Sequence, residues 1–584
     1  MKYLPWATPI IRWLNGMLAV VSIAGLGCLI AQYGFYLTPN FSVLLHRISL
    51  LIVEFYLFQY VVKFLCARRR IEYLRQHWFE SALALLIVSD TALLVRALGI
   101  NVIQGVFFDL NVVAITEVYI GIAQALIFLT LLAGMIRYNA RVLQFRFHPS
   151  HFVIIMFALT IFAGTFLLML PRATVAPHQI SLVDALFTVT SAVCVTGLTV
   201  VDTATYFSHF GQLIILVLIQ IGGLGIMTMA AFLAMFFGQG VDMRGRVVLR
   251  DVMNVERVGS ITTVLRNIIL ITLSIEVVGT VLLMFFWADE GWTFSRLFYY
   301  AVFHSVAAFC NAGFSTFSDN LMGFSADSGI LLTIAGLIIL GGLGFGVIMD
   351  LGASQFLQRK RQVIPRLQIQ TKMVLVYTVV LLVAGTVVYV LFDTGEAWPQ
   401  RLLSGFFISV VSRTCGFNSV DTALLSLPTT FMLIMLMFIG CASGSTGGGI
   451  KINSFGVLLH SIYSIILGKN RIELWKKNIP FAVVNQALVV VVFAVIIVLL
   501  GTFLLTITER GTDFLTLLFE DVSAFGTVGL SRNFSPHLST AGKIIITCTM
   551  FIGRIGTLTL AFAIGTPSDD YRRVQYPPES MMVG

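Results

Sequence analysis

The chain has 584 residues, of which 58% are apolar and only 11% are charged, with a formal net charge of +9. Soluble domains carry about 25% charged residues, so this composition excludes an ordinary water-soluble protein and indicates a polytopic membrane protein. The seven cysteines lie in or beside apolar segments and form no CxxC or disulfide framework.

In chain order, about a dozen apolar runs are long enough to cross a bilayer, which takes roughly 20 residues. Arg and Lys gather in alternate loops, and this positive-inside bias predicts that both termini are cytoplasmic. The predicted spans are 8–35, 42–65, 79–98, 113–136, 151–171, 211–236, 267–288, 328–350, 372–392, 430–457, 481–507 and 540–563.

The first 148 residues form a predicted four-helix bundle. The stretch from Glu54 to Asp90, with Trp78 at an aromatic helix start, resembles the second and third helices of voltage sensors. Steep sensing needs several charges inside the membrane field, but the segment Ile122–Arg146 has basic residues only at its inner end. We therefore expect a voltage-sensor-like or plain accessory bundle and no working sensor.

A short glycine-centred string occurs four times after residue 150, as AVCVTGLT, AFCNAGFS, VSRTCGFN and AFGTVGLS. Aligning the strings superimposes Gly197, Gly313, Gly416 and Gly529, at intervals of 116, 103 and 113 residues. Each string follows a short amphipathic stretch and precedes a long apolar run with a second glycine signature. Repetition of this kind indicates one architectural element used four times: a helix, a re-entrant loop and a second helix.

Four such loops meeting on one axis would point backbone carbonyls at a central passage, as in a cation filter. Glycine suits this place because it adopts positive φ and adds no side chain. The alternative is that the glycines only permit tight helix packing in a membrane, but four of them in matching context favour the filter. The predicted filter residues are Val195, Thr196, Gly197, Asn311, Ala312, Gly313, Thr414, Cys415, Gly416, Thr527, Val528 and Gly529.

From about residue 150 to 565 the chain resembles the Trk/Ktr/HKT superfamily of potassium transporters, and within it the bacterial TrkH/KtrB membrane subunits. The resemblance implies four M1–P–M2 units around one pseudo-fourfold pore, a homodimer, and a cytosolic ring of nucleotide-binding RCK-type subunits similar to TrkA or KtrA. It rests on four pore-loop strings and two inner-helix strings: Thr190–Val200, Phe309–Ser315, Ser412–Asn418, Ser523–Ser531, Gly444–Lys451 and Gly553–Leu560.

The resemblance also implies which ion passes. In this superfamily a Ser at the first-loop filter position is associated with sodium and Gly with potassium, and here Gly197 occupies that position. We therefore expect K⁺ at the filter residues. Cys415 stands where Ala is commoner, a small change that we expect to leave filtering intact. No covalent cofactor is expected, and a nucleotide (ATP/ADP or NAD) would act only through a partner subunit docked on basic inner loops around 238–266, 356–372 and 466–478.

A gate is expected below the filter. The glycines of Gly440–Gly449 each cost about 1 kcal/mol in a helix, so this span must break, and the resemblance makes it a blocking intramembrane loop. Arg554 is an isolated cation within the last apolar run, where an ionisable group is expected to be functional. The resemblance makes it an electrostatic barrier and an anchor of the loop in the closed pore, and a purely structural role is the alternative. The predicted gate residues are Gly440, Ser443, Gly444, Ser445, Thr446, Gly447, Gly448, Gly449, Lys451 and Arg554.

Charged residues elsewhere allow two interpretations. Acidic residues outnumber basic ones in the outer loops, which would concentrate cations at the mouth or would only solvate those loops. Glu276 lies inside the predicted span 267–288, the first helix of its repeat. It is expected to make a packing contact more than to bind an ion. The mouth set includes Asp202, Asp421, Glu520 and Asp521, with Arg413 among the few basic residues.

The predicted fold is therefore an all-α polytopic membrane protein of the bacterial inner membrane. The predicted function is gated, potassium-selective conduction for uptake. A Na⁺- or H⁺-coupled symporter, a less selective K⁺/Na⁺ transporter and a non-conducting scaffold remain alternatives, whereas no HExxH, GxSxG or Walker sequence supports an enzyme. The predicted domains are the bundle 1–148, the repeats 149–262, 263–368, 369–478 and 479–566, and a cytoplasmic tail 567–584.

Overall fold

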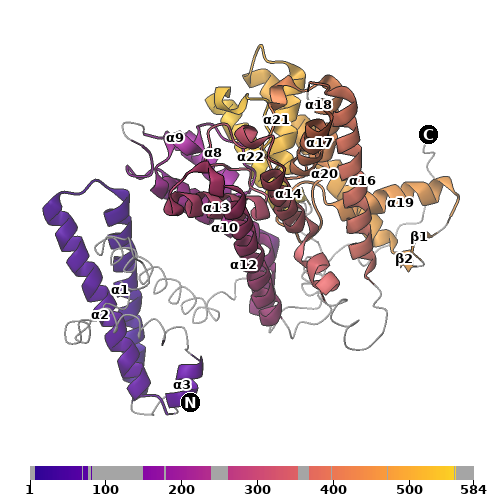
Figure 1. Cartoon of the computed structure of the whole chain (residues 1–584). Helices are drawn as coiled ribbons and strands as arrows, with labels where there is room; N and C mark the ends of the chain where they lie inside the picture. The colour runs from indigo at the N-terminus through magenta and orange to yellow at the C-terminus, as the bar shows by residue number, and fades with distance from the viewer. Residues whose placement is uncertain are drawn as a thin grey trace. The chain divides into compact units, whose positions relative to one another are not determined.

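The computed structural model describes residues 7–68, 70–76, 81, 149–175, 179–237, 261–352, 367–395, 397–469, 471–475, 477–557 and 559–560. The predicted span 113–136 and, apart from residue 81, the predicted span 79–98 lie outside these ranges, as do Trp78 and Asp90. Within them the chain is almost entirely helical (Figure 1). Backbone contacts divide the chain into a first unit, Met1–Arg146 with Leu170–Arg172, and a second unit, Phe147–Met169 with Ala173–Gly584.

In the first unit, two long apolar helices pack against each other. Gln59 of the second helix donates a hydrogen bond to the Leu14 carbonyl of the first at 3.4 Å. Tyr73 of a short third helix packs its ring against the second helix, and Glu54 is exposed. The three helices are α1 (Thr8–Gly34), α2 (Pro39–Leu65) and α3 (Arg70–Gln76).

Four helical quarters follow one another in the second unit. Each quarter has an outer helix, a short buried pore helix and an inner helix, in that order. Quarter 1 comprises α7 (Pro149–Leu168), α8 (Leu182–Val193) and α10 (His209–Phe237), with α9 (Thr203–Tyr206) between the last two. Quarter 2 comprises α12 (Ile261–Phe286), α13 (Phe294–Cys310) and α14 (Ser328–Leu343).

Quarter 3 has a divided inner helix, and it is followed by a small hairpin. Its helices are α16 (Ile369–Phe392), α17 (Trp398–Val411), α18 (Leu427–Phe438) and α19 (Ile452–Ile466), and the antiparallel hairpin is β1 (Ile472–Leu474) with β2 (Lys477–Ile479). Quarter 4 comprises α20 (Phe481–Thr508), α21 (Phe514–Gly526) and α22 (Thr540–Ile555). Short 3₁₀ turns are η3 (Ala288–Glu290), η4 (Met322–Phe324), η5 (Thr422–Leu424) and η6 (Ser535–His537).

A Gly-Thr pair in each outer helix sets how closely the pore helix packs against it. The four glycines of these pairs are Gly164, Gly279, Gly385 and Gly501. A Cβ on them would overlap the pore-helix residue opposite, which is Val189, Ser305, Ser409 and Asp521 in turn. Small residues at such contacts let helix backbones approach closely in a membrane. In quarters 2 and 3 the pore-helix serine also donates to an outer-helix carbonyl, at 2.7 and 2.9 Å.

The quarters close into a ring because each inner helix packs on the pore helix of the next quarter. These contacts join α10 to α13, α14 to α17, α18 to α21 and α22 to α8. The last contact closes the ring, and a salt bridge of 2.6 Å between Lys543 of α22 and Asp184 of α8 supports it. All four quarters therefore run in the same direction around one axis.

The inner spans break more often than the sequence predicted. α14 ends at Leu343, and the chain bends by 94° at Gly344 into the helical segment Phe345–Gly352. α22 ends at Ile555 before Gly556, and both glycines have positive φ, +84° and +89°. Glycine ends helices in this way because it has no Cβ penalty at positive φ. The predicted spans 328–350 and 540–563 are therefore each interrupted at one of these glycines, a break that the sequence prediction did not include.

Four described helices are long and apolar enough to cross a membrane unaided, and the bent pair in quarter 2 would make a fifth. The five shorter apolar helices include the pore helix of quarter 1 and both halves of the third inner span. The qualifying segments are Pro39–Leu65, Arg266–Phe286, Ile369–Phe392 and Phe481–Thr508.

Replacing Gly385 by Leu should lower the unfolding temperature of the protein in detergent. The new side chain would overlap Ser409 and Leu436, and overpacking of this kind costs about 1–3 kcal/mol. Gly336→Leu on α14 is the matched control, because no atom lies within 4 Å of its Cβ position. Equal unfolding temperatures for the two variants would contradict the proposed close packing of outer and pore helices.

Candidate functional site

The four glycine strings lie at the C-terminal ends of the pore helices α8, α13, α17 and α21, and their backbones share an unusual feature. The residue two positions before each filter glycine has positive φ, although none of the four is glycine. These residues are Val195 (φ 56°), Asn311 (φ 64°), Thr414 (φ 91°) and Thr527 (φ 48°). Such conformations cost of order 1–3 kcal/mol each and persist only where the surroundings impose them. The same backbone turn is therefore built four times.

The four filter glycines contact one another in a closed ring. A Cβ on Gly197 would overlap the Ala312 carbonyl, and one on Gly313 would lie 2.8 Å from the backbone of Gly416. A Cβ on Gly416 would overlap Gly529, and one on Gly529 would overlap the Thr196 carbonyl. Three of these glycines also have positive φ, and Gly416 does not. The structure thus brings the predicted filter loops together, with no room for any side chain at the glycine positions.

Two of the loops are held by serines of their own pore helices. The Gly197 amide donates to Ser191 Oγ at 3.0 Å, and the Gly529 amide donates to Ser523 Oγ at 3.1 Å. Both serines are fully buried. Ala307 and Val410 stand at the equivalent place in the other two quarters, and the Gly416 amide donates instead to the Val528 carbonyl of the neighbouring loop.

These serines were not predicted, although the sequence carries a signal for them. The string SA, followed by four residues and then Gly, occurs in the first and fourth loops only, as SAVCVTG and SAFGTVG. Buried backbone N–H groups outside helices need a partner, so a hydroxyl at a fixed distance before the glycine indicates such a bond. Ser191 and Ser523 are therefore positioning residues for two loops of the ring.

The predicted gate loop lies directly against the inner side of the filter loops. Thr446 Oγ1 donates to the Phe309 carbonyl at 3.3 Å. A Cβ on Gly447 would overlap the Thr414 hydroxyl, and one on Gly448 would overlap the Thr527 hydroxyl. The loop therefore touches filter loops of quarters 2, 3 and 4 and leaves no space beneath them at these points.

Two cations hold this loop in place. The Arg554 guanidinium is 2% exposed and donates to the carbonyls of Thr446 and of Gly222 in quarter 1. Lys451 Nζ donates to the Gly447 carbonyl at 2.6 Å and to the Gly448 carbonyl at 3.4 Å. Lys451 thus binds backbone carbonyls of the broken segment. The remaining predicted gate residues, Gly440, Ser443, Gly444, Ser445 and Gly449, lie in the same non-helical stretch.

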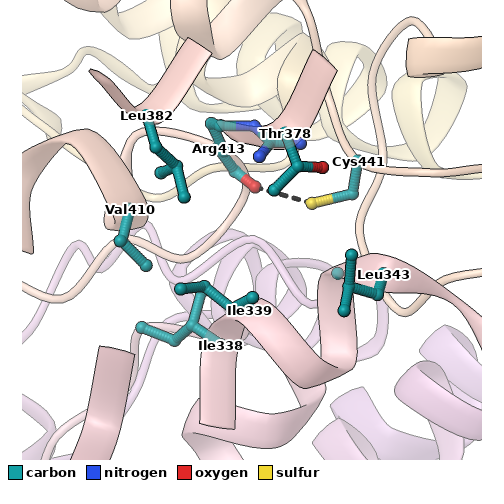
Figure 2. Close-up of a pocket in the computed structure, with 9 residues that line it drawn as sticks. Ile338, Ile339, Leu343, Thr378, Leu382, Val410, Arg413 and Cys441 are labelled. Atoms are coloured by element: carbon teal, nitrogen blue, oxygen red, sulfur yellow. Dashed lines mark hydrogen bonds between the residues drawn. The ribbon is translucent and has the colours of Figure 1, made fainter. Parts of the chain in front are cut away.

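Cys441, which was not among the predicted gate residues, links the gate loop to the third filter loop. Its Sγ donates to the Arg413 carbonyl at 2.9 Å (Figure 2). The same Sγ lies 3.2 Å from the Thr414 hydroxyl. In the aligned glycine signatures it occupies the place of Gly223, Gly342 and Arg554. The alignment could have singled out Cys441, because a thiol stands there in place of glycine or arginine.

Three charged residues predicted at the outer mouth are instead buried. Glu520 and Asp521 on α21 are fully buried, and Arg413 is 5% exposed. The Glu520 carboxylate accepts hydrogen bonds from the hydroxyls of Ser531 and Ser535, at 2.5 and 2.7 Å. The prediction that these side chains lie exposed in outer loops is therefore wrong. Around the pore helix, hydroxyl groups donate hydrogen bonds to the Glu520 carboxylate and so allow it to be buried.

Two further acids of the mouth set, Asp202 and Asp421, form hydrogen bonds between neighbouring loops. Asp202 accepts from the Ala204 amide at 3.0 Å and from the Ser318 hydroxyl of quarter 2 at 2.7 Å. Asp421 accepts from the Ala423 amide at 2.9 Å and from Asn533 of quarter 4 at 3.1 Å. These carboxylates therefore join neighbouring loops in addition to any effect on cations.

Glu276 lies on α12 behind the second pore helix, and its position fits a packing role. It is 5% exposed, and its backbone carbonyl accepts from Ser305 of α13 at 2.7 Å and from Thr280 at 2.8 Å. Its Oε1 has no hydrogen-bond partner in the described ranges.

The chain is similar to proteins described as cation or potassium transporters. Residues 116–574 match the family model of TrkH, described as a cation transport protein. The chain is 39% identical over 447 residues to Ktr system potassium uptake protein B of Bacillus subtilis, covering 75% of this chain and 97% of that protein. It is 32% identical over 452 residues to potassium/sodium uptake protein NtpJ of Enterococcus hirae, covering 75% and 98%.

A solved structure shares the fold. The crystal structure of the potassium transporter TrkH from Vibrio parahaemolyticus superimposes with a TM-score of 0.60 at 19% identity, covering 76% of this chain and 91% of that one. The predicted all-α membrane fold is therefore confirmed, with the short β1–β2 hairpin as its one departure in the described residues.

Replacing both Ser191 and Ser523 by Ala should lower the ratio of K⁺ to Na⁺ flux into liposomes. Each lost hydrogen bond is worth about 1 kcal/mol, a factor of about five, and leaves a filter amide unpaired. The control is Ser412→Ala, because the Ser412 hydroxyl donates to the Ser409 carbonyl at 3.0 Å and holds no filter amide. A double variant that folds and keeps the parental ratio would show that these serines do not position the filter.

Proposed function

The chain belongs to the TrkH family of cation transport proteins, and on that premise we propose that it is a potassium-selective, gated conducting protein for K⁺ uptake. The observation that carries the proposal is the closed ring of four glycine backbones contributed by four quarters of the same direction. A ring of this kind fits a pore with a filter. Secondary symporters commonly have inverted repeats, which these quarters are not.

In the proposed filter, backbone carbonyls of the four loops replace the hydration shell of K⁺. The C-terminal ends of α8, α13, α17 and α21 carry partial negative charge and point it toward the passing cation. The relatives named for potassium uptake support K⁺ as the cargo, as does glycine at Gly197. The Enterococcus relative is named for both potassium and sodium, so a less selective transporter is the second candidate.

In the proposed gate, the loop Gly440–Gly449 blocks the passage below the filter and Arg554 places a positive charge on the route. Both of the hydrogen bonds that Arg554 donates go to backbone carbonyls of this region, from quarters 3 and 1. Conduction then requires that the loop leave the underside of the filter. The Arg554 guanidinium is buried and always charged. Movement of this group away from the conduction pathway would therefore also lower the electrostatic barrier to a cation.

The setting of the pore is also proposed. The protein would lie in the bacterial inner membrane with both termini in the cytoplasm, as a homodimer with one pore per subunit. The Ktr relatives are named as parts of a system, which supports a cytosolic regulatory partner. An RCK-type ring that binds ATP/ADP or NAD would dock on the basic inner loops, among them the loop that forms the β1–β2 hairpin.

Purified protein in liposomes at fixed voltage should pass K⁺ and Rb⁺ well above Na⁺. Gly197→Ser should reduce that preference, because a side chain at φ +95° would overlap the Ala312 carbonyl and distort the ring. The control is Gly468→Ser, which also has positive φ but has open space around its Cβ position. Equal K⁺ and Na⁺ flux through the parent would overturn the ion assignment, and an unchanged ratio in Gly197→Ser would remove this glycine from the filter.

Arg554→Gln should conduct more ions than the parent protein. The substitution removes a charge and weakens two charge-assisted hydrogen bonds, each worth about 1.5–3 kcal/mol, so we expect roughly tenfold or greater opening. A variant shortened within Gly444–Gly449 should do the same. Cys548→Ser, at an exposed position of the same helix, is the control. Variants that fold but conduct no more than the parent would argue against the loop as a gate.

A further inference from the structure

Two buried pore-helix residues contact the chain that follows the filter glycine of their own loop. His304 of α13 stands nine positions before Gly313, and its Nε2 lies 3.0 Å from the hydroxyl of Ser315, two positions after that glycine. Glu520 of α21 accepts a hydrogen bond from the Ser531 hydroxyl at 2.5 Å, and these two residues stand at the same intervals from the fourth filter glycine. We term the two contacts loop braces, and both pore-helix side chains in them are fully buried.

The other two quarters lack this contact. In quarter 1 the corresponding residues are Thr188 and Thr199, and the Thr188 hydroxyl has no hydrogen-bond partner in the described ranges. In quarter 3 they are Phe407 and Asn418, and a phenyl ring has no polar atom that could bind a loop side chain. The quarters follow one another around the ring, so quarters 2 and 4 lie opposite each other. The loop braces therefore act on two opposed loops of the four.

The donors and acceptors in the quarter 2 brace follow from its geometry. His304 Nδ1 lies 2.8 Å from the Tyr300 carbonyl, which can only accept, so Nδ1 carries the proton. The ring packs against Trp287 and stacks on Phe317 at 4.7 Å, and burial among aromatic rings favours its neutral form. Nε2 of the neutral ring is then the acceptor for the Ser315 hydroxyl. Ser315 Oγ in turn accepts from the Phe317 amide at 3.0 Å, which ties the loop backbone to the ring.

The brace of quarter 4 reaches further along the chain. Glu520 Oε1 also accepts from the Arg532 amide at 3.0 Å, and Oε2 accepts from the Ser535 hydroxyl at 2.7 Å. Hydrogen bonds to a carboxylate are stronger than those between neutral groups. In both quarters one pore-helix side chain thus holds a hydroxyl and a backbone amide of the segment after the glycine, directly or through the serine.

This segment leads away from the gate. The residues two positions before the filter glycines, among them Thr414 and Thr527, face the gate loop, so the chain after the glycines continues toward the opposite side of the filter. Filter carbonyls that could move inward would replace the hydration shell of the smaller Na⁺ as well as that of K⁺. Fixing two opposed loops limits such contraction across the axis.

We propose that His304 and Glu520 are positioning residues that hold two opposed filter loops apart and thereby raise the preference for K⁺ over Na⁺. The inference rests on the proposed function, because the loops must form a filter before their spacing can select an ion. Neither residue has to touch the ion, since each acts through a serine and the loop backbone. A role in stability alone would lower the unfolding temperature and leave the ratio of K⁺ to Na⁺ flux unchanged.

The test measures the ratio of K⁺ to Na⁺ flux into liposomes that hold the full-length protein. Ser315→Ala and Ser531→Ala each remove one brace, and we expect each to lower the ratio about fivefold, the cost of one hydrogen bond. Ser315→Thr and Ser531→Thr keep the hydroxyl and should keep the parental ratio. The matched control is Ser318→Ala, because the Ser318 hydroxyl donates to Asp202 of a neighbouring outer loop and not to a pore helix.

A double-mutant cycle tests whether the brace of quarter 2 acts as one bond. His304→Phe puts the quarter 3 residue in quarter 2 and should lower the ratio as much as Ser315→Ala does. The two changes together should lower it no further, because they break the same hydrogen bond.

The outcomes separate the loop braces from the filter itself. A parent that selects K⁺ while Ser315→Ala and Ser531→Ala keep the ratio of Ser318→Ala would overturn the braces. Additive effects in the cycle, or Thr variants as impaired as the Ala variants, would overturn them too. Equal K⁺ and Na⁺ flux through the parent would instead overturn the proposed function, and the braces with it.

Discussion

Four backbones can meet on one axis only where no side chain intervenes, and most of the second unit follows from that constraint. Gly197, Gly313, Gly416 and Gly529 each lack room for a Cβ because the next loop fills it. The pore helices must approach the axis closely to bring the loops there, and the Gly-Thr pairs of the outer helices permit this approach. The extended backbone also needs partners inside the protein, which pore-helix serines and neighbouring carbonyls provide.

Sequence reasoning predicted what is local and repeated. The four strings, the broken span at Gly440–Gly449 and the isolated Arg554 were all visible because glycine and charge are rare signals within apolar runs. The bonds from Thr446 to Phe309 and from Gly416 to Val528 join residues more than 100 positions apart, so no local pattern encodes them. The left-handed turns were also missed, because Val, Asn and Thr adopt them only when the surrounding loops impose them.

The quarters share a plan but differ in how each loop is held. Quarters 1 and 4 use a buried serine on the filter amide, whereas quarter 3 has none and relies on the neighbouring Val528 carbonyl. Quarter 3 also carries Arg413, the long non-helical break between α18 and α19 and the Cys441 thiol. The chemical differences are therefore concentrated where the filter and the gate loop share contacts. In the proposed pore, a fourfold plan with one distinct quarter would place the gate on a single element.

Under the proposed function, this arrangement would couple the gate to the filter. In the proposed closed state, the gate loop satisfies the Phe309 and Arg413 carbonyls through Thr446 and Cys441. Buried carbonyls need partners, so departure of the loop requires water or the permeating ion to take its place at the underside of the filter. Departure of the loop would also remove one of the two carbonyls to which Arg554 donates. A loop with fewer contacts to the filter could still block the passage, but its opening would not prepare the filter for a cation.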